Sequence, residues 1–182
     1  MTIQLWDRVP QEDLFMGNKT TCCTAIGTGG NGAATPVYLL NTSYNVVFLR
    51  NSQGEVVGMS RVFMSKVDDK PALIMDNIEL NKTYIKGMDF DSDIKDIRNG
   101  FFDYMNKYAE TITGNKNAQI YFYSQDIHVP TIDLEHKKAV TSFVGNLSQE
   151  NIYVNASGCR WIDPTKLEEI GEIDWLVVPK NK

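Results

Sequence analysis

The alternation of hydrophobic and polar residues predicts a β-hairpin in the first half of the chain. β-Branched and aromatic residues dominate 44–50 (YNVVFLR) and 55–67 (EVVGMSRVFMSKV), and the polar, glycine-containing stretch 51–54 separates them. Such runs on either side of a short turn are typical of paired antiparallel strands. A second turn at 68–71 leads to 72–80 (ALIMDNIEL), whose alternation predicts a third antiparallel strand.

A change of period to three and four residues predicts a long helix over 92–112. Its apolar positions form one stripe: Ile94, Ile97, Phe101, Tyr104, Met105, Tyr108 and Ile112. Asp91 or Ser92 can cap its start, and Gly114 ends it. The apolar run that follows, 118–123 (AQIYFY), is short and continuous, which is typical of a parallel strand buried on both faces.

The remaining segments complete the predicted order β, α, β-β hairpin, β, long α, β, α, β, β. Small apolar residues over 20–26 predict a first strand, and 33–40 a short helix. A weaker helix is expected over 134–143, and closing strands over 152–155 and 174–178. This order predicts an α/β (α+β) fold, in which helices flank a mixed, mostly antiparallel sheet.

The length of 182 residues, without repeats or linkers, predicts a single domain over 1–182. We expect 20–178 to form its core and 1–19 an N-terminal extension. The strands 72–80 and 118–123 are expected to be adjacent and parallel, because the helix between them provides the crossover. The predicted core residues are Val47, Phe48, Val57, Phe63, Leu73, Ile74, Ile78, Ile97, Phe101, Met105, Ile120 and Phe122.

Charge and composition narrow the class of protein. The formal net charge of -5 argues against binding to nucleic acids or anionic membranes, which require clustered Lys and Arg. No apolar run approaches the ~18 residues of a membrane span, and three cysteines are too few for a disulfide scaffold. A cytoplasmic protein is therefore expected.

The element order and several residues resemble the GNAT superfamily of acyl-CoA N-acyltransferases. In that family a hairpin leads to a strand ending in an acidic residue, then a phosphate loop, a long helix and a partly parallel strand, as 72–123 does here. Tyr153, Gly158 and Trp161 are similar to a tyrosine and a glycine-aromatic pair near the family's end. The resemblance, over about 20–178, implies transfer of an acetyl or other acyl group from acyl-CoA to an amine on a small molecule or a protein.

The resemblance also implies roles for individual residues. Glu79 matches the general base, and its apolar neighbours favour the raised pKa that a base of this kind needs. Tyr153 matches the acid that protonates the leaving thiolate. The backbone at Leu80 and Asn81 would hold the pantetheine arm. Asp76 lies three residues before Glu79 on the same predicted strand, so we expect the two carboxylates on opposite faces; an exposed Glu79, or one paired with Lys82, is the structural alternative.

The expected phosphate loop is degenerate. Only Gly87 and Gly100 remain of its glycines, and four carboxylates stand where phosphates would lie: Asp89, Asp91, Asp93 and Asp96. Three cations are expected to meet the pyrophosphate instead: Lys86, Lys95 and Arg98. The acidic helix start favours the alternative of a non-catalytic, GNAT-like domain that binds a partner.

A Cys-His thiol hydrolase is a further alternative. Cys22 or Cys23 would be the nucleophile, activated by His128 or His136. Asp126 or Asp133 would orient the histidine. No helix-start signature follows the cysteines, so they are interpreted as buried strand residues. The hypothesis of a zinc site, formed by these cysteines and histidines with Cys159, is weaker still, because no CxxC or HxxxH spacing is present. No metal is expected. The glycine cluster 27–32 lacks the spacing of a nucleotide loop and is expected to be a connection or a lid.

Overall fold

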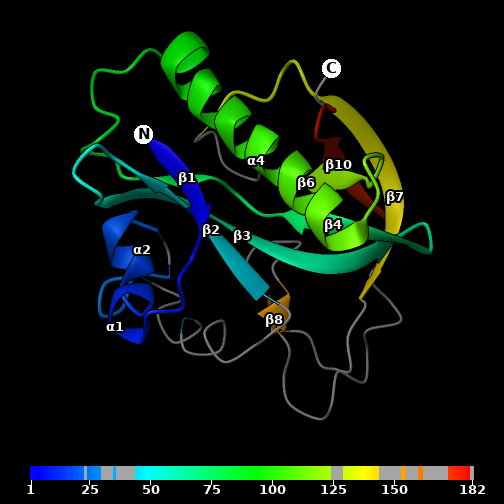
Figure 1. Ribbon diagram of the computed structural model, residues 1–182, viewed down its shortest axis with the longest axis horizontal. Coiled ribbons are helices and arrows are strands. Elements are labelled where there is room, and N and C mark those ends of the chain that lie inside the picture. The colour runs from blue at the N-terminus through cyan, green and yellow to red at the C-terminus, as the bar shows by residue number, and fades with distance from the viewer. Residues whose placement is uncertain are drawn as a thin grey trace.

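The protein has a mixed α+β fold built on one large sheet, as the residue pattern predicts (Figure 1). The computed structural model describes residues 1–22, 24–29, 35, 44–123, 129–143, 153–154, 160–161 and 172–180. Eight strands form the sheet, and all of their pairings except one are antiparallel. In the described part of the chain, no helix is both long and apolar enough to cross a membrane.

The strands follow the order β1-β2-β3-β4-β6-β10-β7 across the sheet, with β5 paired to β3. Their bounds are Thr2–Leu5 (β1), Tyr44–Arg50 (β2), Val56–Val67 (β3), Lys70–Met75 (β4), Glu79–Leu80 (β5), Ile120–Phe122 (β6), Glu135–Phe143 (β7) and Glu172–Val177 (β10). A separate pair joins Tyr153–Val154 (β8) to Arg160–Trp161 (β9). The helices are Pro10–Asp13 (α1), Met16–Lys19 (α2) and Lys95–Thr113 (α4), the last preceded by a π-helical turn, Phe90–Ile94.

The predicted hairpin is confirmed. β2 and β3 pair from Tyr44 opposite Phe63 to Arg50 opposite Val56. Gly54 has a φ of 82° in the turn between them, a conformation that costs glycine little. At the next turn Asp68 and Asp69 also have positive φ, which short polar residues tolerate best among non-glycine residues.

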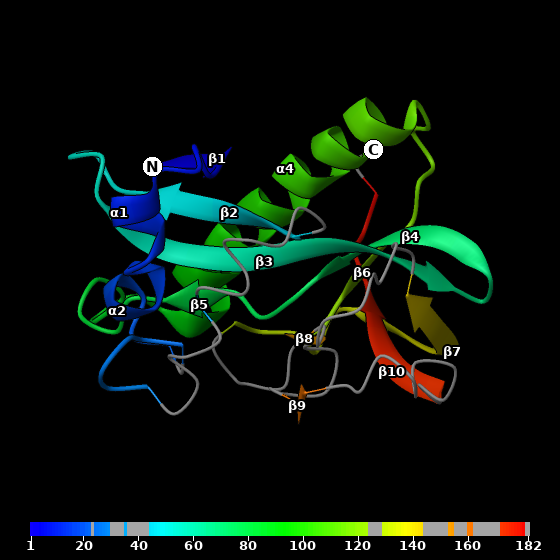
Figure 2. The same cartoon turned by 90° about the horizontal axis from the view of Figure 1, so that it is seen from below.

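The predicted parallel pair and its crossover helix are also confirmed. β4 and β6 lie side by side and parallel, with Leu73 opposite Ile120 and Met75 opposite Phe122. α4 crosses one face of the sheet between them (Figures 1 and 2). It ends at Gly114, whose φ of 65° is the left-handed conformation of a helix C-cap.

Successive residues of the central strands pack into cores on opposite faces of the sheet. Val47 and Leu49 of β2 lie in the core under α4 with Phe101 and Met105. Val46 and Phe48 pack on the other face, against Met16 of α2. All twelve predicted core residues are buried. α4 and the α1–α2 pair therefore cover opposite faces.

The segment 134–143, predicted as a helix, is instead the strand β7. Its side chains alternate, with Lys137 half-buried and Ala139 buried between exposed neighbours, and it pairs with β10 along Glu172–Val177. A helix there would have no apolar stripe to bury, so pairing to β10 satisfies its backbone instead. The closing strand predicted over 174–178 is confirmed as β10, whereas β8, within 152–155, pairs outside the main sheet.

The segment 20–26, predicted as a strand, forms turns behind α2. Thr20 and Cys22 donate backbone hydrogen bonds to the carbonyls of Met16 and Gly17. A Cβ on Gly17 would lie 2.6 Å from the backbone of Thr24, so the glycine allows this close return of the chain. The residues before it, expected to be an extension, contribute β1 to the sheet. The helix predicted over 33–40 lies outside the described residues, apart from Thr35.

Candidate functional site

The third strand of the predicted sheet breaks at Asp76, and this break shapes the candidate site. Tyr123 donates its backbone N–H to the carbonyl of Met75 at 2.8 Å, the last bond between β4 and β6. The N–H of Asp76 then bonds to the carbonyl of Arg61 on β3, also at 2.8 Å. β5 continues along β3, with Glu79 opposite Met59. Continued pairing would place Ile78 opposite Met59, so the chain gains one residue relative to β3 between Asp76 and Glu79.

Leu80 and Glu79 point to opposite faces of the sheet at β5. Leu80 packs in the core under α4, directly across from Gly58. A Cβ on Gly58 would lie 2.8 Å from Leu80 Cδ2, which explains the glycine within this strand. Glu79 is paired with Met59, whose side chain packs on the α1–α2 face. Directly opposed residues share a face, so Glu79 lies on the α1–α2 face and is only 9% exposed.

Asp76 and Glu79 share that face, so the prediction that they lie on opposite faces is wrong. Asp76 Oδ2 accepts a hydrogen bond from Arg61 Nη1 at 3.1 Å, and Arg61 follows Met59 by two positions on β3. The alternation of a regular strand does not hold here because residues 76–78 leave the ladder. The break thus brings both carboxylates to one side.

Arg61 connects Asp76 to the turn after α2. Its Nη2 donates to Thr24 Oγ1 at 3.0 Å and to Cys22 Sγ at 3.5 Å. Arg61 and Asp76 are 4% and 2% exposed, so the ion pair is buried, and a buried charge requires such partners. The arrangement holds the α2 turn against the broken strand.

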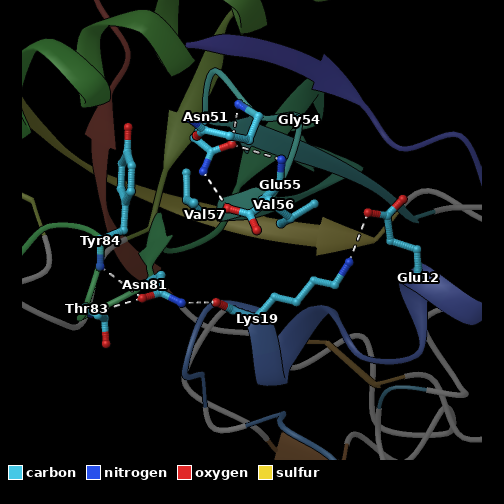
Figure 3. Close-up of a pocket in the computed structure, with 11 residues that line it drawn as sticks. Glu12, Lys19, Asn51, Gly54, Glu55, Val56, Val57, Asn81, Thr83 and Tyr84 are labelled. Atoms are coloured by element: carbon cyan, nitrogen blue, oxygen red, sulfur yellow. Dashed lines mark hydrogen bonds and ion pairs between the residues drawn. The ribbon is translucent and has the colours of Figure 1, made fainter.

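A cavity of about 630 Å³ opens beside the end of β5 (Figure 3). Glu12, Lys19, Asn51, Gln53, Gly54, Glu55, Val56, Val57, Asn81, Thr83 and Tyr84 line it. Asn81 forms part of the wall and fixes its shape: its amide donates to the carbonyl of Lys19, and its Oδ1 accepts from the N–H groups of Thr83 and Tyr84 at 2.9 and 3.1 Å. Glu79 precedes Asn81 by two residues, so its side chain lies one step further along the same face.

The charges on the cavity wall differ in how they are balanced. Glu12 is bound by Arg50 at 3.0 and 3.1 Å and by Lys19 at 3.0 Å, and chiefly the Arg50 hydrogen bond lowers the pKa of Glu12 to about 2. Glu55 accepts from Asn51 Nδ2 at 2.8 Å. Among the described residues, no cation pairs with Glu55. Figure 3 shows Tyr84 on the opposite side of the cavity from the Lys19–Glu12 pair.

The start of the long helix is capped by its own carboxylates. Asp89 Oδ1 accepts from the N–H groups of Asp91 and Ser92 at 3.0 and 2.8 Å, and Asp93 Oδ2 accepts from the N–H of Asp89 at 3.0 Å. The hydrogen bond from the Ser92 hydroxyl contributes most to lowering the pKa of Asp89, and the bonds from the N–H groups of Ser92 and Asp91 lower it further. The amides that would bind a phosphate at a helix N-terminus are thus occupied.

Two of the three predicted phosphate-binding cations are bound to Asp133. Arg98, buried in α4, donates to both Asp133 oxygens at 2.6 and 3.1 Å, and Lys95 Nζ lies 2.9 Å from Oδ2. These bonds hold the pKa of Asp133 well below its usual range, with Arg98 the largest cause. Lys86 is exposed, and no carboxylate of the described residues pairs with it.

The second predicted catalytic residue lies on a strand of the separate two-stranded sheet. Tyr153 belongs to β8, where it is opposite Trp161 in the two-stranded sheet. Its side chain lies outside what the structure describes.

The cysteine and the histidine of the thiol-hydrolase alternative lie in different places. Cys22 is buried and contacts Thr24 Oγ1 at 3.2 Å. His136, exposed on β7, lies 3.3 Å from Asp174 of β10. Asp133 contacts Arg98 rather than a histidine. Cys23, Asp126, His128 and Cys159 lie outside the described residues, and among those described no three His, Cys, Asp or Glu side chains gather as metal ligands.

Comparison with known proteins identifies no family. No protein-family model matches the chain, and no curated protein is significantly similar to it. The function therefore has to be inferred from the site. Sequence reasoning missed Arg61, although an arginine in the middle of the apolar run 55–67 is a signal for a buried ion pair. It considered Asp133 only as a carboxylate that orients a histidine, not as the partner of Arg98 and Lys95.

Proposed function

We propose that the protein is an N-acyltransferase that uses acyl-CoA and binds the amine acceptor in the cavity beside β5. The observation that carries this proposal is the position of Glu79. It is a nearly buried carboxylate on β5, just after the parallel pairing of β4 with β6 ends, and two residues before Asn81, which lines the cavity of about 630 Å³. Burial in general raises the pKa of a carboxylate, and a general base works best when its pKa lies near the working pH.

The cavity suits a cationic acceptor. An amine enters as its ammonium form, and Glu55 is the wall carboxylate that no described cation neutralises, so it attracts that charge. Tyr84 offers an aromatic face on the side of the cavity away from Lys19 and Glu12, where an ammonium group is favoured. The Lys19 ammonium is paired with Glu12, which it shares with Arg50, so its repulsion of the acceptor is offset in part.

In the proposed reaction, Glu79 removes one proton from the ammonium group, directly or through a water molecule. The amine nitrogen then attacks the thioester carbonyl, so that a C–N bond forms and the C–S bond breaks. The leaving thiolate takes a proton from Tyr153, and the tyrosinate then takes the remaining excess proton from the acylated nitrogen. Glu79 later releases its proton to solvent, so that the amide and the free CoA thiol are the products. Proton transfer of this kind typically contributes 10²–10⁴-fold to a rate, on the order expected for a single base.

The donor is proposed to lie beside β5, after the parallel pairing of β4 with β6 ends. Its pantetheine arm would bond to the backbone at Leu80, and at Asn81 only through the carbonyl, because the Asn81 N–H is bonded to Val57. Its pyrophosphate would meet Lys86, while Asp133 offsets the charges of Lys95 and Arg98. Without free helix amides, the attraction depends on exposed cations. Binding is therefore expected to be weak and to fall as salt rises.

A second candidate is a non-catalytic domain of the same shape that binds a partner. The capping of the helix start by Asp89 supports this alternative, because the carboxylate occupies the amides and repels a pyrophosphate. The proposal and the alternative differ in one property, the binding of acyl-CoA.

Calorimetric titration with millimolar acetyl-CoA, at about 20 and 200 mM salt, tests the proposal. We expect saturable binding that weakens at high salt, followed by amide formation with a panel of primary amines. Glu55→Gln is expected to raise KM for the amine with little change in kcat, while Glu135→Gln, on exposed β7, serves as the matched control. Absence of acetyl-CoA binding at low salt would leave the partner-binding alternative.

A further inference from the structure

β1 ends the sheet and leaves one edge without a neighbouring strand in the described part of the chain (Figure 2). Trp6 donates its N–H to Val46, so the hydrogen-bonded pairs of β1 and β2 fall at Trp6, Gln4 and Thr2. In an antiparallel pair the residues between them direct their backbone groups outward. The N–H and carbonyl of Ile3 and the carbonyl of Leu5 therefore point to the open edge, and Leu5 N–H already bonds to Tyr104 Oη at 2.9 Å.

A groove of about 350 Å³ lies between this edge and α4. Met1, Ile3, Leu49, Ile97, Gly100 and Tyr104 supply its apolar wall. Gly100 allows Ile3 to pack closely against α4, because a Cβ at this position would lie 2.9 Å from Ile3 Cδ1. The groove can therefore receive an apolar side chain from a segment lying beside β1.

The rim of the groove is acidic. Asp96 and Asp103 are exposed on α4 and line the groove. Lys107 is the one cation among the lining residues. Seven residues separate the two aspartates, so they lie roughly 10 Å apart along the helix, a span that long basic side chains on one strand can reach. A second copy of this chain would bring the same acidic rims together, so the charge favours a basic partner over self-association.

We propose that the β1 edge and its groove bind an extended basic peptide segment by strand addition. The segment pairs with the backbone of Ile3, places an apolar side chain in the groove, and directs Lys or Arg side chains to Asp96 and Asp103. Main-chain bonds give such a complex its affinity, and the pocket and the charges give it specificity. This inference is independent of the acyltransferase proposal.

The test uses a fluorescent seven-residue peptide, Thr-Lys-Thr-Val-Thr-Lys-Thr, in which Lys, Val and Lys share one face of a strand (the Lys-Val peptide). In a second peptide the central Thr-Val-Thr is replaced by Pro-Pro-Pro (the Lys-Pro peptide). Both peptides have the same charge, but proline has no N–H to donate and fits poorly in an added strand. Fluorescence anisotropy is expected to show saturable binding of the Lys-Val peptide and binding at least 10-fold weaker for the Lys-Pro peptide. Equal binding of both would reduce the effect to non-specific charge attraction and overturn the proposal.

Asp103→Lys is expected to weaken binding of the Lys-Val peptide about 5- to 20-fold. Glu110→Lys, the same change on an exposed position of the same helix outside the groove, is the matched control and should leave binding unchanged. Amide exchange followed by NMR should show slower exchange at Ile3 when the peptide is bound. An unchanged affinity in Asp103→Lys, or concentration-dependent dimers in light scattering that displace the peptide, would contradict the inference.

Discussion

Glu79 is the residue on which the proposed chemistry depends most directly. Glu79→Gln keeps the size and the hydrogen-bonding capacity of the side chain but cannot accept a proton, so turnover at neutral pH should fall roughly 10²-fold or more. The thermal midpoint should stay close to that of the parent, which circular dichroism measures. Full activity in a folded Glu79→Gln variant would remove Glu79 from the mechanism.

Asp13 makes the stability of the protein depend on pH. It is 2% exposed, and burial, with repulsion from Glu12 and Asp7, raises its pKa to about 6. A pKa raised in the folded state means that the protonated form stabilises the fold. This contribution is complete below the usual value of 3.8 and is lost as pH rises through about 6.

Asp13→Asn should therefore stabilise the protein by about 1–3 kcal/mol at pH 8 and have little effect at pH 4. Urea unfolding at both pH values measures the difference, with Asp69→Asn, an exposed aspartate that does not act on Asp13, as control. A gain of the same size at both pH values would show that burial of charge is not the cause.

At the scale of elements, the start of α4 tests where the donor binds. Asp89→Asn keeps a capping oxygen for the amides of Asp91 and Ser92 but removes a negative charge. If the pyrophosphate approaches this turn, acetyl-CoA should bind roughly 2- to 5-fold more tightly at low salt, by an effect of the size of a surface charge pair. Asp103→Asn, further along the helix, provides the comparison, and equal affinities in both variants would place the pyrophosphate elsewhere.

The elements that depend on local pattern could be predicted from the sequence. The β2–β3 hairpin, α4 and the parallel β4–β6 pair were predicted because each has a clear period or turn and buries its apolar face in the expected way. β7 could not be predicted, since its identity depends on pairing with β10, more than thirty residues later in the chain. Its own residues carry too few apolar positions to favour one period.

The candidate site was harder to predict for the same physical reason. The position of Glu79 at the end of the third strand was evident from the pattern, but its face depends on the break at Asp76. That break is fixed by contacts with Arg61 of β3. The cavity joins the 51–55 turn, α2 and the 81–84 turn, which are far apart in sequence, so no local motif indicates it.

At the scale of the whole molecule, β3 connects the parts, because it pairs with β2, β4, β5 and β7. If the chain folds as one cooperative domain, damage to one face should destabilise strands everywhere in the sheet. Phe101→Ala removes a fully buried ring under α4 and should cost about 3–5 kcal/mol. Hydrogen exchange should then show an equal loss of protection in β2, which lies near one edge, and in β10, near the other. A loss confined to β2 and α4, with β10 unchanged, would instead divide the chain into two independently stable units.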